Sequence, residues 1–521
     1  MQHAQPDPVQ RKVAAFLGDP RSHGGAAVER VDTHAAMVFL AGDRAYKLKR
    51  AVRYPYLDFS TVERRHAACV AELALNRRTA PTLYLGVAPV LRRAGGLALG
   101  GDGTAPTDQA LDWVVVMRRF PADALLERMA ERSALTDDLM RALADAVAAF
   151  HQAAERRTDG GGATAMRAVV DGNLRELRES PALFPPDRVE RLASRSISAL
   201  ERLAPLMEAR RANGFVRHGH GDLHLRNIVL LDGRPTLFDG IEFDESLAVI
   251  DVVYDLAFLL MDLEQRGLRI HANTVLNRWL DVTGDLDGLA LLPLFLSMRA
   301  AVRAKVAAAA AWLRADEGAV AKGSAAKLER EAVDHLDFAI RALDPAPPRL
   351  IAVGGLSGTG KSRLALGLAP WVGPMPGAVV LRSDVRRKRL FGVADTDRLP
   401  AEAYDAAVTR RVYAMLVDEA RRVLAAGHAA VVDAVHARPE ERAAIAAAAR
   451  DSRVRFDGVW LDAPLETRVA RVTSRRGDAS DATAEVAKHQ ESYDVGAIDW
   501  LRVDAGRDAG DALAAVRERL A

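Results

Sequence analysis

The sequence predicts two successive folds, an α+β domain of two lobes and then an α/β domain with a mostly parallel sheet. Three observations lead to this prediction. The chain has 521 residues, whereas a single domain usually has about 100–200. A proline-rich stretch at 344–349 cannot continue a helix and favours an extended spacer. Beyond it, short apolar strands alternate with helices, which is the pattern of a doubly wound parallel sheet.

The proline-rich stretch also sets the predicted domain bounds, which are 1–343 and 350–521 with 344–349 as the linker. A long alanine-rich helix is expected from about Leu292 up to the linker. The elements predicted after the linker are an apolar strand at 350–355, helices at 401–426 and 438–450, and short strands at 429–432 and 459–461. Glycine runs at 95–103 and 160–162 predict loops.

Composition narrows the class of protein. Hydrophobic residues make up 49% and charged residues 27% of the chain, which excludes a disordered or fibrous protein. A formal net charge of +2 creates no global field that would recruit nucleic acid or anionic lipid. The single cysteine, Cys69, cannot form an internal disulfide, and the sequence has neither a signal pattern nor the ~20-residue apolar stretch that spans a bilayer. We therefore expect a cytoplasmic protein with no membrane partner.

The segment that follows the first strand after the linker reads GLSGTGKS and fits the pattern GxxxxGK[ST]. Its glycines allow a sharp turn in which backbone N–H groups point at phosphates, and the next helix, expected from about Ser362, adds its positive end. Lys361 is expected to reach the β- and γ-phosphates of ATP, and the Ser362 hydroxyl to ligate Mg²⁺. The predicted nucleotide-binding residues are Gly355, Ser357, Gly358, Thr359, Gly360, Lys361 and Ser362.

Two carboxylates downstream of this loop are candidates for the chemistry. Asp433 ends the predicted strand at 429–432 and would hold Mg²⁺ or orient the phosphates, unless it only caps the next helix. Asp384 lies in LRSDVRRK and is a candidate general base, with a helix N-cap as the alternative. Arg386 and Arg387 follow it and either hold an anionic substrate or form a solvated helix turn.

Four arginines near the C-terminus share one face of a predicted helix, namely Arg468, Arg471, Arg475 and Arg476. Such a face can close as a mobile lid on the phosphates and stabilise developing charge, or it can simply be solvated.

The segments GGLSGTGKS, RSDVRRK, AVVDAVHARPEER and RVTSRRGDASDAT resemble the small P-loop kinases, including the gluconate-kinase-like, zeta-toxin-like and polynucleotide-kinase-like families. The resemblance covers nearly all of 350–521. It implies transfer of the γ-phosphate of ATP to a hydroxyl group, with Asp384 as the base and with Arg471 and Arg475 in the lid.

The first predicted domain contains a different arrangement. HGDLHLRN at 220–227 is followed by apolar residues and then by Asp239, which is the spacing of a protein-kinase catalytic loop and metal site. In that arrangement Asp222 accepts or orients the proton of the substrate hydroxyl, while Asn227 and Asp239 bind Mg²⁺. The intervening residues predict a short hairpin. Asp251 and Asp255 are expected to brace the loop through hydrogen bonds.

A phosphate-binding lysine is expected on the strand AYKLK. Lys47 matches the lysine of the V-A-I-K pattern, and Lys49 on the same strand face is a second candidate. Glu72, on a predicted helix, would pair with the lysine and position it. The segment 31–37 has no glycine-rich loop, so Thr33, His34 and the turn at 41–42 would have to cover the phosphates.

The segments HGDLHLRN, FDGIEFD and DVVYDLAFLLMDL resemble the aminoglycoside phosphotransferase-like branch of the protein-kinase-like fold. The whole chain is similar to bacterial proteins that join this domain to a P-loop kinase. The resemblance implies a bilobal protein-kinase-like domain followed by an α/β P-loop domain, with ATP and Mg²⁺ as cofactors.

These observations predict a tandem ATP-dependent kinase that phosphorylates hydroxyl groups of small molecules. An aminoglycoside is a polycation and needs a carboxylate-lined site. The helical region after Asp255 offers Asp262 and Glu264, but it also carries Arg266, Arg269, Arg299 and Arg303, which suits a neutral or anionic acceptor at least as well.

Two alternatives remain open at this stage. The missing glycine loop would suit a first domain that is a nucleotide-sensing pseudokinase and regulates the second. The second domain would act on a nucleic-acid 5′-hydroxyl if its arginines bind phosphates, a set that comprises Arg382, Arg386, Arg387 and Arg389.

Overall fold

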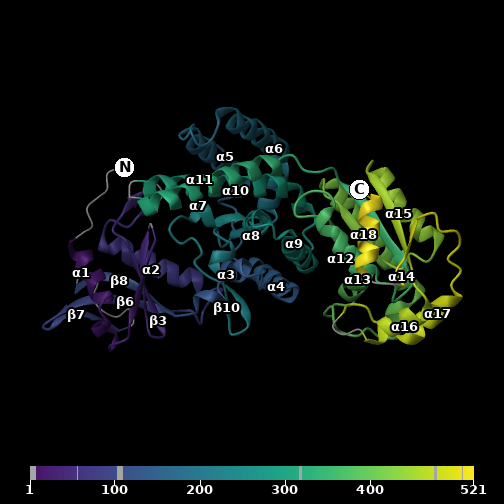
Figure 1. Cartoon of the computed structure of the whole chain (residues 1–521), viewed down its shortest axis with the longest axis horizontal. Coiled ribbons are helices and arrows are strands. Elements are labelled where there is room, and N and C mark those ends of the chain that lie inside the picture. The colour runs from purple at the N-terminus through teal and green to yellow at the C-terminus, as the bar shows by residue number, and fades with distance from the viewer. Residues whose placement is uncertain are drawn as a thin grey trace. The chain divides into compact units, whose positions relative to one another are not determined.

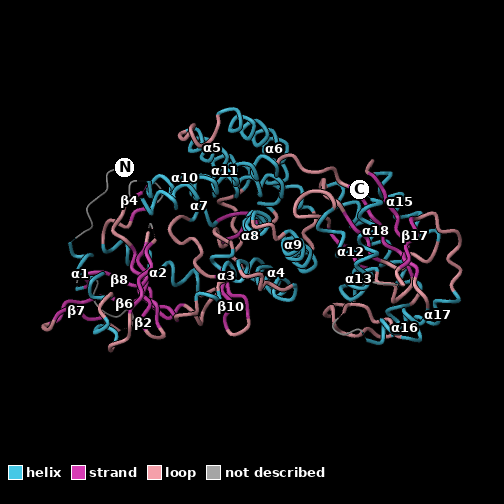
Figure 2. Tube along the Cα trace, in the orientation of Figure 1, coloured by secondary structure: helices cyan, strands magenta, loops and turns pink. Residues whose placement is uncertain are grey.

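The computed structural model describes residues 8–33, 35–54, 57–101, 109–315, 319–474, 478–506 and 509–520 (Figures 1 and 2). Two compact units are present. The first comprises the residues up to Asp171 together with Leu200–Asp262, and the second comprises Gly172–Ala199 together with Leu263 onwards. The proline-rich linker lies within the second unit, and the domain boundary proposed there remains a prediction. None of the described helices is long and apolar enough to cross a membrane.

The strands are β1 (Val28–Asp32), β2 (Ala36–Ala41), β3 (Arg44–Lys49), β4 (Arg53–Tyr54), β5 (Leu57–Asp58), β6 (Tyr84–Arg93), β7 (Gly96–Leu99), β8 (Ala110–Arg118), β9 (Val216–His218), β10 (Ile228–Leu231), β11 (Arg234–Leu237), β12 (Val249–Asp251), β13 (Arg349–Gly355), β14 (Val379–Arg382), β15 (Ala430–Asp433), β16 (Arg455–Asp462) and β17 (Leu501–Asp504). The helices are α1 (Pro8–Leu17), α2 (Val62–Asn76), α3 (Leu126–Glu131), α4 (Asp137–Ala153), α5 (Gly162–Arg178), α6 (Pro186–Ala212), α7 (Glu245–Ala248), α8 (Val252–Gln265), α9 (Arg269–Thr283), α10 (Leu292–Ala315), α11 (Ala319–Ala342), α12 (Lys361–Leu368), α13 (Ser383–Leu390), α14 (Ala406–Ala425), α15 (Pro439–Asp451), α16 (Leu465–Ser474), α17 (Ala484–His489) and α18 (Ala509–Leu520).

The first unit is built on a six-stranded antiparallel sheet with the order β1-β2-β3-β8-β6-β7. Side chains alternate between its two faces. On β8, Val114 packs with α1 on one face, whereas Trp113 and Val115 pack with α2 on the other. Leu48 of β3 lies on the α1 face. Its neighbours Lys47 and Lys49 therefore face α2. The alternation thus directs two lysine side chains of β3 toward the helix that carries Glu72.

The catalytic-loop segment lies further along the first unit. β10 and β11 form the predicted antiparallel hairpin, in which Ile228 pairs with Leu237. This hairpin returns the chain from Asn227 to Asp239. The apolar run that follows, within α8, is buried.

The second unit contains a five-stranded sheet with the order β14-β15-β13-β16-β17, and every strand pair in it is parallel. Helices α12 and α18 pack on it through an apolar cluster that includes Leu364, Leu368 and Val516. Figure 2 shows helices on both sides of these strands. The predicted α/β fold with a mostly parallel sheet is confirmed. The stretch predicted as one alanine-rich helix from Leu292 to the linker contains two helices, α10 and α11, which pack against each other.

Two other predicted elements also differ from the structure. Residues 96–99, predicted as loop, form β7, because Leu97 and Leu99 alternate inward onto the α1 face of the sheet. The predicted continuous helix at 401–426 is instead a 3-10 turn at Ala401–Tyr404 followed by α14 from Ala406, with extended backbone at Asp405 between them.

Candidate active sites

Residues 220–227, the predicted catalytic loop of the first unit, are anchored by α8. The carboxylate of Asp255 is fully buried and accepts hydrogen bonds from the backbone N–H groups of His220 (2.8 Å) and Gly221 (3.0 Å). His151 Nε2 lies 3.2 Å from the same carboxylate. The prediction that Asp255 braces the loop is confirmed. Asp251 has a different partner, since it forms a buried two-contact ion pair with Arg210.

Three residues predicted from spacing lie together in the first unit. Asn227 Nδ2 donates to Asp222 Oδ2 at 2.8 Å and to the backbone oxygen of Asp239 at 3.5 Å. Asp239 adopts a left-handed φ of +60°. Its N–H donates to the Tyr84 hydroxyl (3.2 Å), and the next N–H, of Gly240, donates to Asn76 Oδ1 (2.9 Å). These two bonds fix the turn that directs the Asp239 carboxylate toward the lysine.

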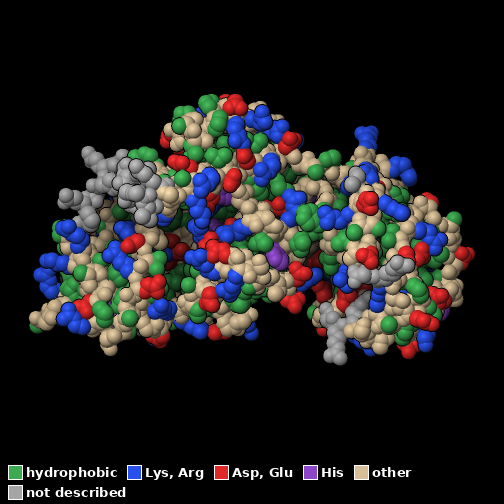
Figure 3. All heavy atoms as spheres, viewed as in Figure 1, with side chains coloured by type: hydrophobic (Ala, Val, Ile, Leu, Met, Phe, Trp, Pro, Cys, Tyr) green, Lys and Arg blue, Asp and Glu red, His purple; other side chains and the backbone are tan. Residues whose placement is uncertain are grey.

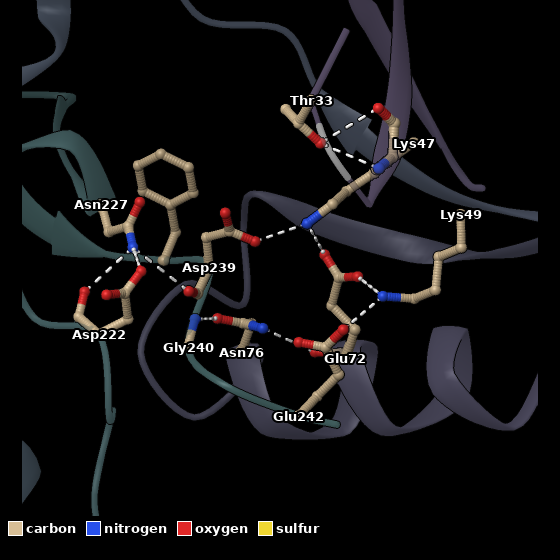
Figure 4. A network of polar contacts seen from close by, with 12 residues as sticks. Thr33, Lys47, Lys49, Glu72, Asn76, Asp222, Asn227, Asp239, Gly240 and Glu242 are labelled. Carbon is tan, nitrogen blue, oxygen red and sulfur yellow. Dashed lines mark hydrogen bonds and ion pairs between the residues drawn. The ribbon is translucent and has the colours of Figure 1, made fainter. Parts of the chain in front are cut away.

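Both candidate lysines meet Glu72, as Figure 4 shows. Lys47 Nζ lies 2.8 Å from Glu72 Oε1 and 2.5 Å from Asp239 Oδ1. Lys49 Nζ lies 2.7 Å from Glu72 Oε2 and also pairs with Glu242. The Lys47 side chain is 16% exposed, whereas that of Lys49 is 2% exposed. The ammonium group of Lys47 therefore lies beside the Asp239 carboxylate, whose side chain is 41% exposed, whereas that of Lys49 lies inside the protein.

Charge pairing keeps Glu72 and Lys47 ionised. Burial by itself would raise the pKa of Glu72. The charges of the adjacent Lys47 and Lys49 lower it by more than that, so the pKa lies well below the usual range. Burial lowers the pKa of Lys47, and the carboxylates of Asp239 and Glu72 outweigh that effect and raise it. Glu72 is therefore a fixed counter-charge shared by two ammonium groups.

The turn between β1 and β2 lies where a glycine-rich loop would fall. The Thr33 hydroxyl accepts from Ala36 N–H (2.9 Å) and donates to the Ala36 carbonyl (3.1 Å). This side-chain bond shapes the turn without a glycine. His34 lies outside the described residues. Gly42, with φ +56°, forms the turn between β2 and β3.

The phosphate loop of the second unit connects β13 to α12. Gly355, Gly358 and Gly360 have φ values of +138°, +86° and +95°. A β-carbon on Gly358 would lie 2.5 Å from the carbonyl oxygen of Arg468. Lys361 Nζ donates to the Leu356 carbonyl within the loop (3.1 Å). Helix α12 begins at Lys361 with no side-chain cap, and the positive end of the helix dipole lies at the loop.

Two further strand ends lie beside this loop, because parallel strands end at the same edge. β14 and β15 pair so that Arg382 lies opposite Asp433, and their side chains approach to 3.4 Å. Asp384 follows two residues after Arg382 and accepts a hydrogen bond from Ser480. Burial first, and the nearby Asp433 charge second, raise the pKa of Asp384 above its ordinary value. This suits a group that takes up a proton.

The basic residues around Asp384 have partners inside the protein. Arg386 is 1% exposed and pairs with Asp281 and Glu419. Arg387 donates to the Ala403 carbonyl at 2.6 Å. Both arginines are buried, so they do not form a solvated helix turn. Their role in holding an anionic substrate stays a prediction.

The predicted lid is only partly described. Arg471, on α16, donates to the backbone oxygens of Ala505 (2.8 Å) and Thr359 (3.5 Å), and the second of these belongs to the phosphate loop. Arg475 and Arg476 lie outside the described residues. Arg468 is buried and pairs with Glu491.

Several residues of these sites could not be found from motifs. Gln490 Oε1 accepts from the Ser357 N–H of the phosphate loop at 2.6 Å. His436 is 1% exposed, has φ +51°, and has no hydrogen-bond partner on its ring nitrogens among the described residues. Burial lowers its pKa to about 3, with the charge of Lys361 adding to the effect. Glu242 lies three residues after Asp239, and its acidic neighbours in FDGIEFD were the only signal for it.

The ligands available for Mg²⁺ are oxygen atoms. No group of three or more His, Cys, Asp or Glu side chains gathers as a metal site within the described part of the chain. Mg²⁺ usually keeps several waters and takes one or two protein carboxylates together with substrate phosphates. Asn227 with Asp239, and Ser362 with Asp433, fit that kind of site.

Two family models match this arrangement. The phosphotransferase enzyme family matches residues 43–292, and an AAA domain family matches residues 350–493. Two kinase-like domains in one chain support a phosphotransferase.

Relatives extend over nearly the whole sequence. Uncharacterized proteins of Mycobacterium tuberculosis (strain H37Rv) and Mycobacterium bovis are each 35% identical over 481 residues, which is 89% of this chain and 90% of the relative. The chain belongs to the same family as these proteins. In this chain an aminoglycoside phosphotransferase-like domain precedes a P-loop kinase-like domain.

Solved structures resemble each part separately. A choline/ethanolamine kinase family protein from Mesorhizobium loti is 13% identical and covers 64% of this chain and 99% of its own, with a TM-score of 0.39. An APS kinase of Mycobacterium tuberculosis is 23% identical and covers 34% of this chain and 98% of its own, with a TM-score of 0.25.

Proposed function

We propose that the chain is a tandem ATP-dependent kinase in which each site transfers the γ-phosphate of ATP to a hydroxyl group of a small molecule. The observation that carries this proposal is the convergence of Lys47, Asp222, Asn227 and Asp239 from separate segments of the first unit. A phosphate loop beside Asp384 and Asp433 supports a second site of the same reaction type.

In the first site, Asp222 orients the acceptor hydroxyl and takes its proton, while Asn227 and Asp239 hold Mg²⁺. Lys47 is the phosphate-binding lysine, because its ammonium lies beside the accessible Asp239 carboxylate. Lys49 has a structural role, since it closes a buried pair of ion pairs with Glu72 and Glu242. Mg²⁺ supplies neutralisation of phosphate charge when it is bound.

In the second site, the loop amides, Lys361 and Ser362 hold the phosphates and the metal, and Asp433 orients them. Asp384 takes the proton from the acceptor hydroxyl, which its raised pKa favours. Arg471, which donates to the Thr359 carbonyl of the phosphate loop, completes the site.

The charges of the described residues favour a neutral or anionic acceptor over a polycation. Asp262 accepts a hydrogen bond from the Leu225 N–H at 2.9 Å, and Glu264 pairs with Arg269 at 3.0 Å. Both carboxylates that could have bound a polycation therefore already have partners within the protein. Figure 3 shows basic and acidic side chains intermingled on the visible face. The arginines that motivated the nucleic-acid alternative have internal partners, and these arginines are Arg382, Arg386, Arg387 and Arg389. We therefore expect no strongly salt-dependent oligonucleotide binding.

The decisive experiment is a screen of a metabolite extract with γ-labelled ATP. The full chain is compared with Asp222→Asn, with Lys361→Ala and with the double variant. We expect each single variant to lose one set of labelled products and to keep the other, and the double variant to lose both. A fall of at least about 100-fold in the affected set is expected, because a catalytic base or a phosphate-binding group contributes that much.

The same screen distinguishes the alternatives. Products that are unchanged in Asp222→Asn would contradict phosphotransfer at the first site and favour the nucleotide-sensor interpretation. Products that are unchanged in Lys361→Ala would reject the second site.

A further inference from the structure

Helix α9 lies along the open edge of the five-stranded sheet. β14 is the edge strand of this sheet and pairs with β15 on one side only. On its other side, Asn277 Oδ1 accepts from Val380 N–H (2.7 Å), and Asn277 Nδ2 donates to the Ala378 carbonyl (3.2 Å). Asn273 Nδ2 donates to the same carbonyl at 3.1 Å. Both asparagines are buried.

These bonds have the pattern of a neighbouring strand. In a parallel pair, one residue accepts from the N–H that follows its partner and donates to the carbonyl that precedes it. Asn277 does the same around Val379, so its carboxamide takes the place of the N–H and C=O groups of one residue of a neighbouring strand. An unpaired edge presents a row of free N–H and C=O groups. Helix α9 therefore satisfies the edge with side chains.

A second attachment lies just beyond β14. Arg386, on α13, pairs with Asp281 near the end of α9 and with Glu419 of α14 at 2.5 Å. Arg389 also donates to the backbone oxygen of Asp281. Arg386 is 1% exposed, and a buried charge that loses a partner is costly. The ion pair therefore fixes the position of α13 against α9.

The two attachments flank the proposed base. Ala378 and Val380 precede Asp384, and Arg386 follows it by two positions. Residues two apart on a helix do not face each other. Arg386 can therefore hold α13 from one side while Asp384 is presented on another, toward Asp433 and Lys361, whose charges shift its pKa.

We infer that α9 holds β14 and α13 in place at the second site and that Asp281 is a positioning residue for Asp384. This inference rests on the proposed function of Asp384. It crosses the family boundaries, because α9 belongs to the segment matched by the phosphotransferase family, whereas Asp384 belongs to the AAA domain match. The P-loop site is thus completed by a helix that precedes the linker.

The test uses the full chain with Asp281→Asn, Asp384→Asn and the double variant. The second site's activity is the basal hydrolysis of Mg·ATP, with water as acceptor, that disappears in Lys361→Ala. Affinity for Mg·AMP-PNP, in a background that carries Lys47→Met at the first site, and hydrogen exchange of residues 378–390 are measured alongside. Asp287→Asn is the matched control, because Asp287 forms an exposed ion pair with Arg422 in the same region.

We expect Asp281→Asn to lower the hydrolysis rate about ten-fold or more, since a small displacement of a catalytic group has that effect. Exchange at 378–390 should rise, and Mg·AMP-PNP affinity should stay within about two-fold, because the phosphate loop is untouched. Asp281→Asn should add nothing to Asp384→Asn, since it acts through that residue. Asp287→Asn should leave all three measurements unchanged.

Full hydrolysis in Asp281→Asn, or losses that simply add in the double variant, would overturn the inference while leaving Asp384 as the base. Full hydrolysis in Asp384→Asn would reject the proposed base and the inference with it. Glu419 still neutralises Arg386 in Asp281→Asn, which favours folding. If that variant does not fold, Asp281→Glu keeps the charge and moves it. A loss of hydrolysis with retained Mg·AMP-PNP affinity then supports the inference, and full hydrolysis overturns it.

Discussion

The two sites hold their lysines by opposite means. Lys47 lies between two carboxylates, Glu72 and Asp239, which come from other parts of the chain. Lys361 is the first residue of α12, and its ammonium group donates to the Leu356 carbonyl in the loop just before the helix. The first site is built from charged side chains, and the second from backbone conformation. The first should therefore be sensitive to the loss of a charge, and the second to the gain of a β-carbon.

Replacing Lys47 and Lys49 separately by methionine should give the largest effects at the first site. Lys47→Met should lower the ATP turnover that depends on Asp222 by about 100-fold or more, because it removes a charge next to the phosphates. Lys49→Met should instead lower the free energy of unfolding of the first unit by about 3 kcal/mol, because buried Glu242 loses its partner. Turnover in the Lys361→Ala background and chemical denaturation provide the two measurements. The reverse pattern would make Lys49 the phosphate-binding lysine.

Glycine substitutions test the backbone-built site. Gly358→Ala should weaken Mg·AMP-PNP binding at the second site at least about ten-fold, because a left-handed φ costs an alanine about 1–2 kcal/mol and the new β-carbon meets the Arg468 backbone. Gly360→Ala has the same kind of strain, but its β-carbon meets nothing within 4 Å. Calorimetry in the Lys47→Met background should therefore show the smaller loss for Gly360→Ala. Equal losses would mean that strain alone matters.

The pH dependence should show the smallest effect. Asp384 must be deprotonated to act as a base, and its pKa lies above the ordinary value of 3.8. Activity of the second site should therefore fall as the pH decreases through this raised pKa, at a higher pH than an ordinary aspartate would give. The pH profile of Lys361-dependent hydrolysis measures this limb. A limb that persists in Asp384→Asn would assign it to another group.

The contrast also explains what the sequence could predict. The phosphate loop consists of consecutive residues whose types follow from backbone geometry, so the motif alone located it. The spacing of Asp222, Asn227 and Asp239 was readable for a similar reason, because a short hairpin connects them. The choice between Lys47 and Lys49 was not readable, since both lie on one strand face and only their depth in the fold separates them.

Long-range contacts account for the remaining differences. Arg386, two positions after Asp384, was interpreted either as a substrate ligand or as part of a solvated helix turn. It is buried and pairs with Asp281, which is 105 positions away. Gln490 meets Ser357 across 133 positions. No local pattern encodes such pairs, because they depend on how whole helices pack. Residues 96–99 were assigned to a loop for a local reason. The nearby glycines were taken as a loop signal, although Leu97 and Leu99 alternate as in a strand.

The asparagines of α9 have a practical consequence for the solubility of any shortened chain. The proline-rich linker is the natural place to separate the two catalytic regions. A fragment that starts there would lack Asn273 and Asn277 and would present β14 as an open edge. Open edges pair with strands of other molecules. Such a fragment should self-associate, whereas one that begins ahead of α9 carries its own cover for that strand.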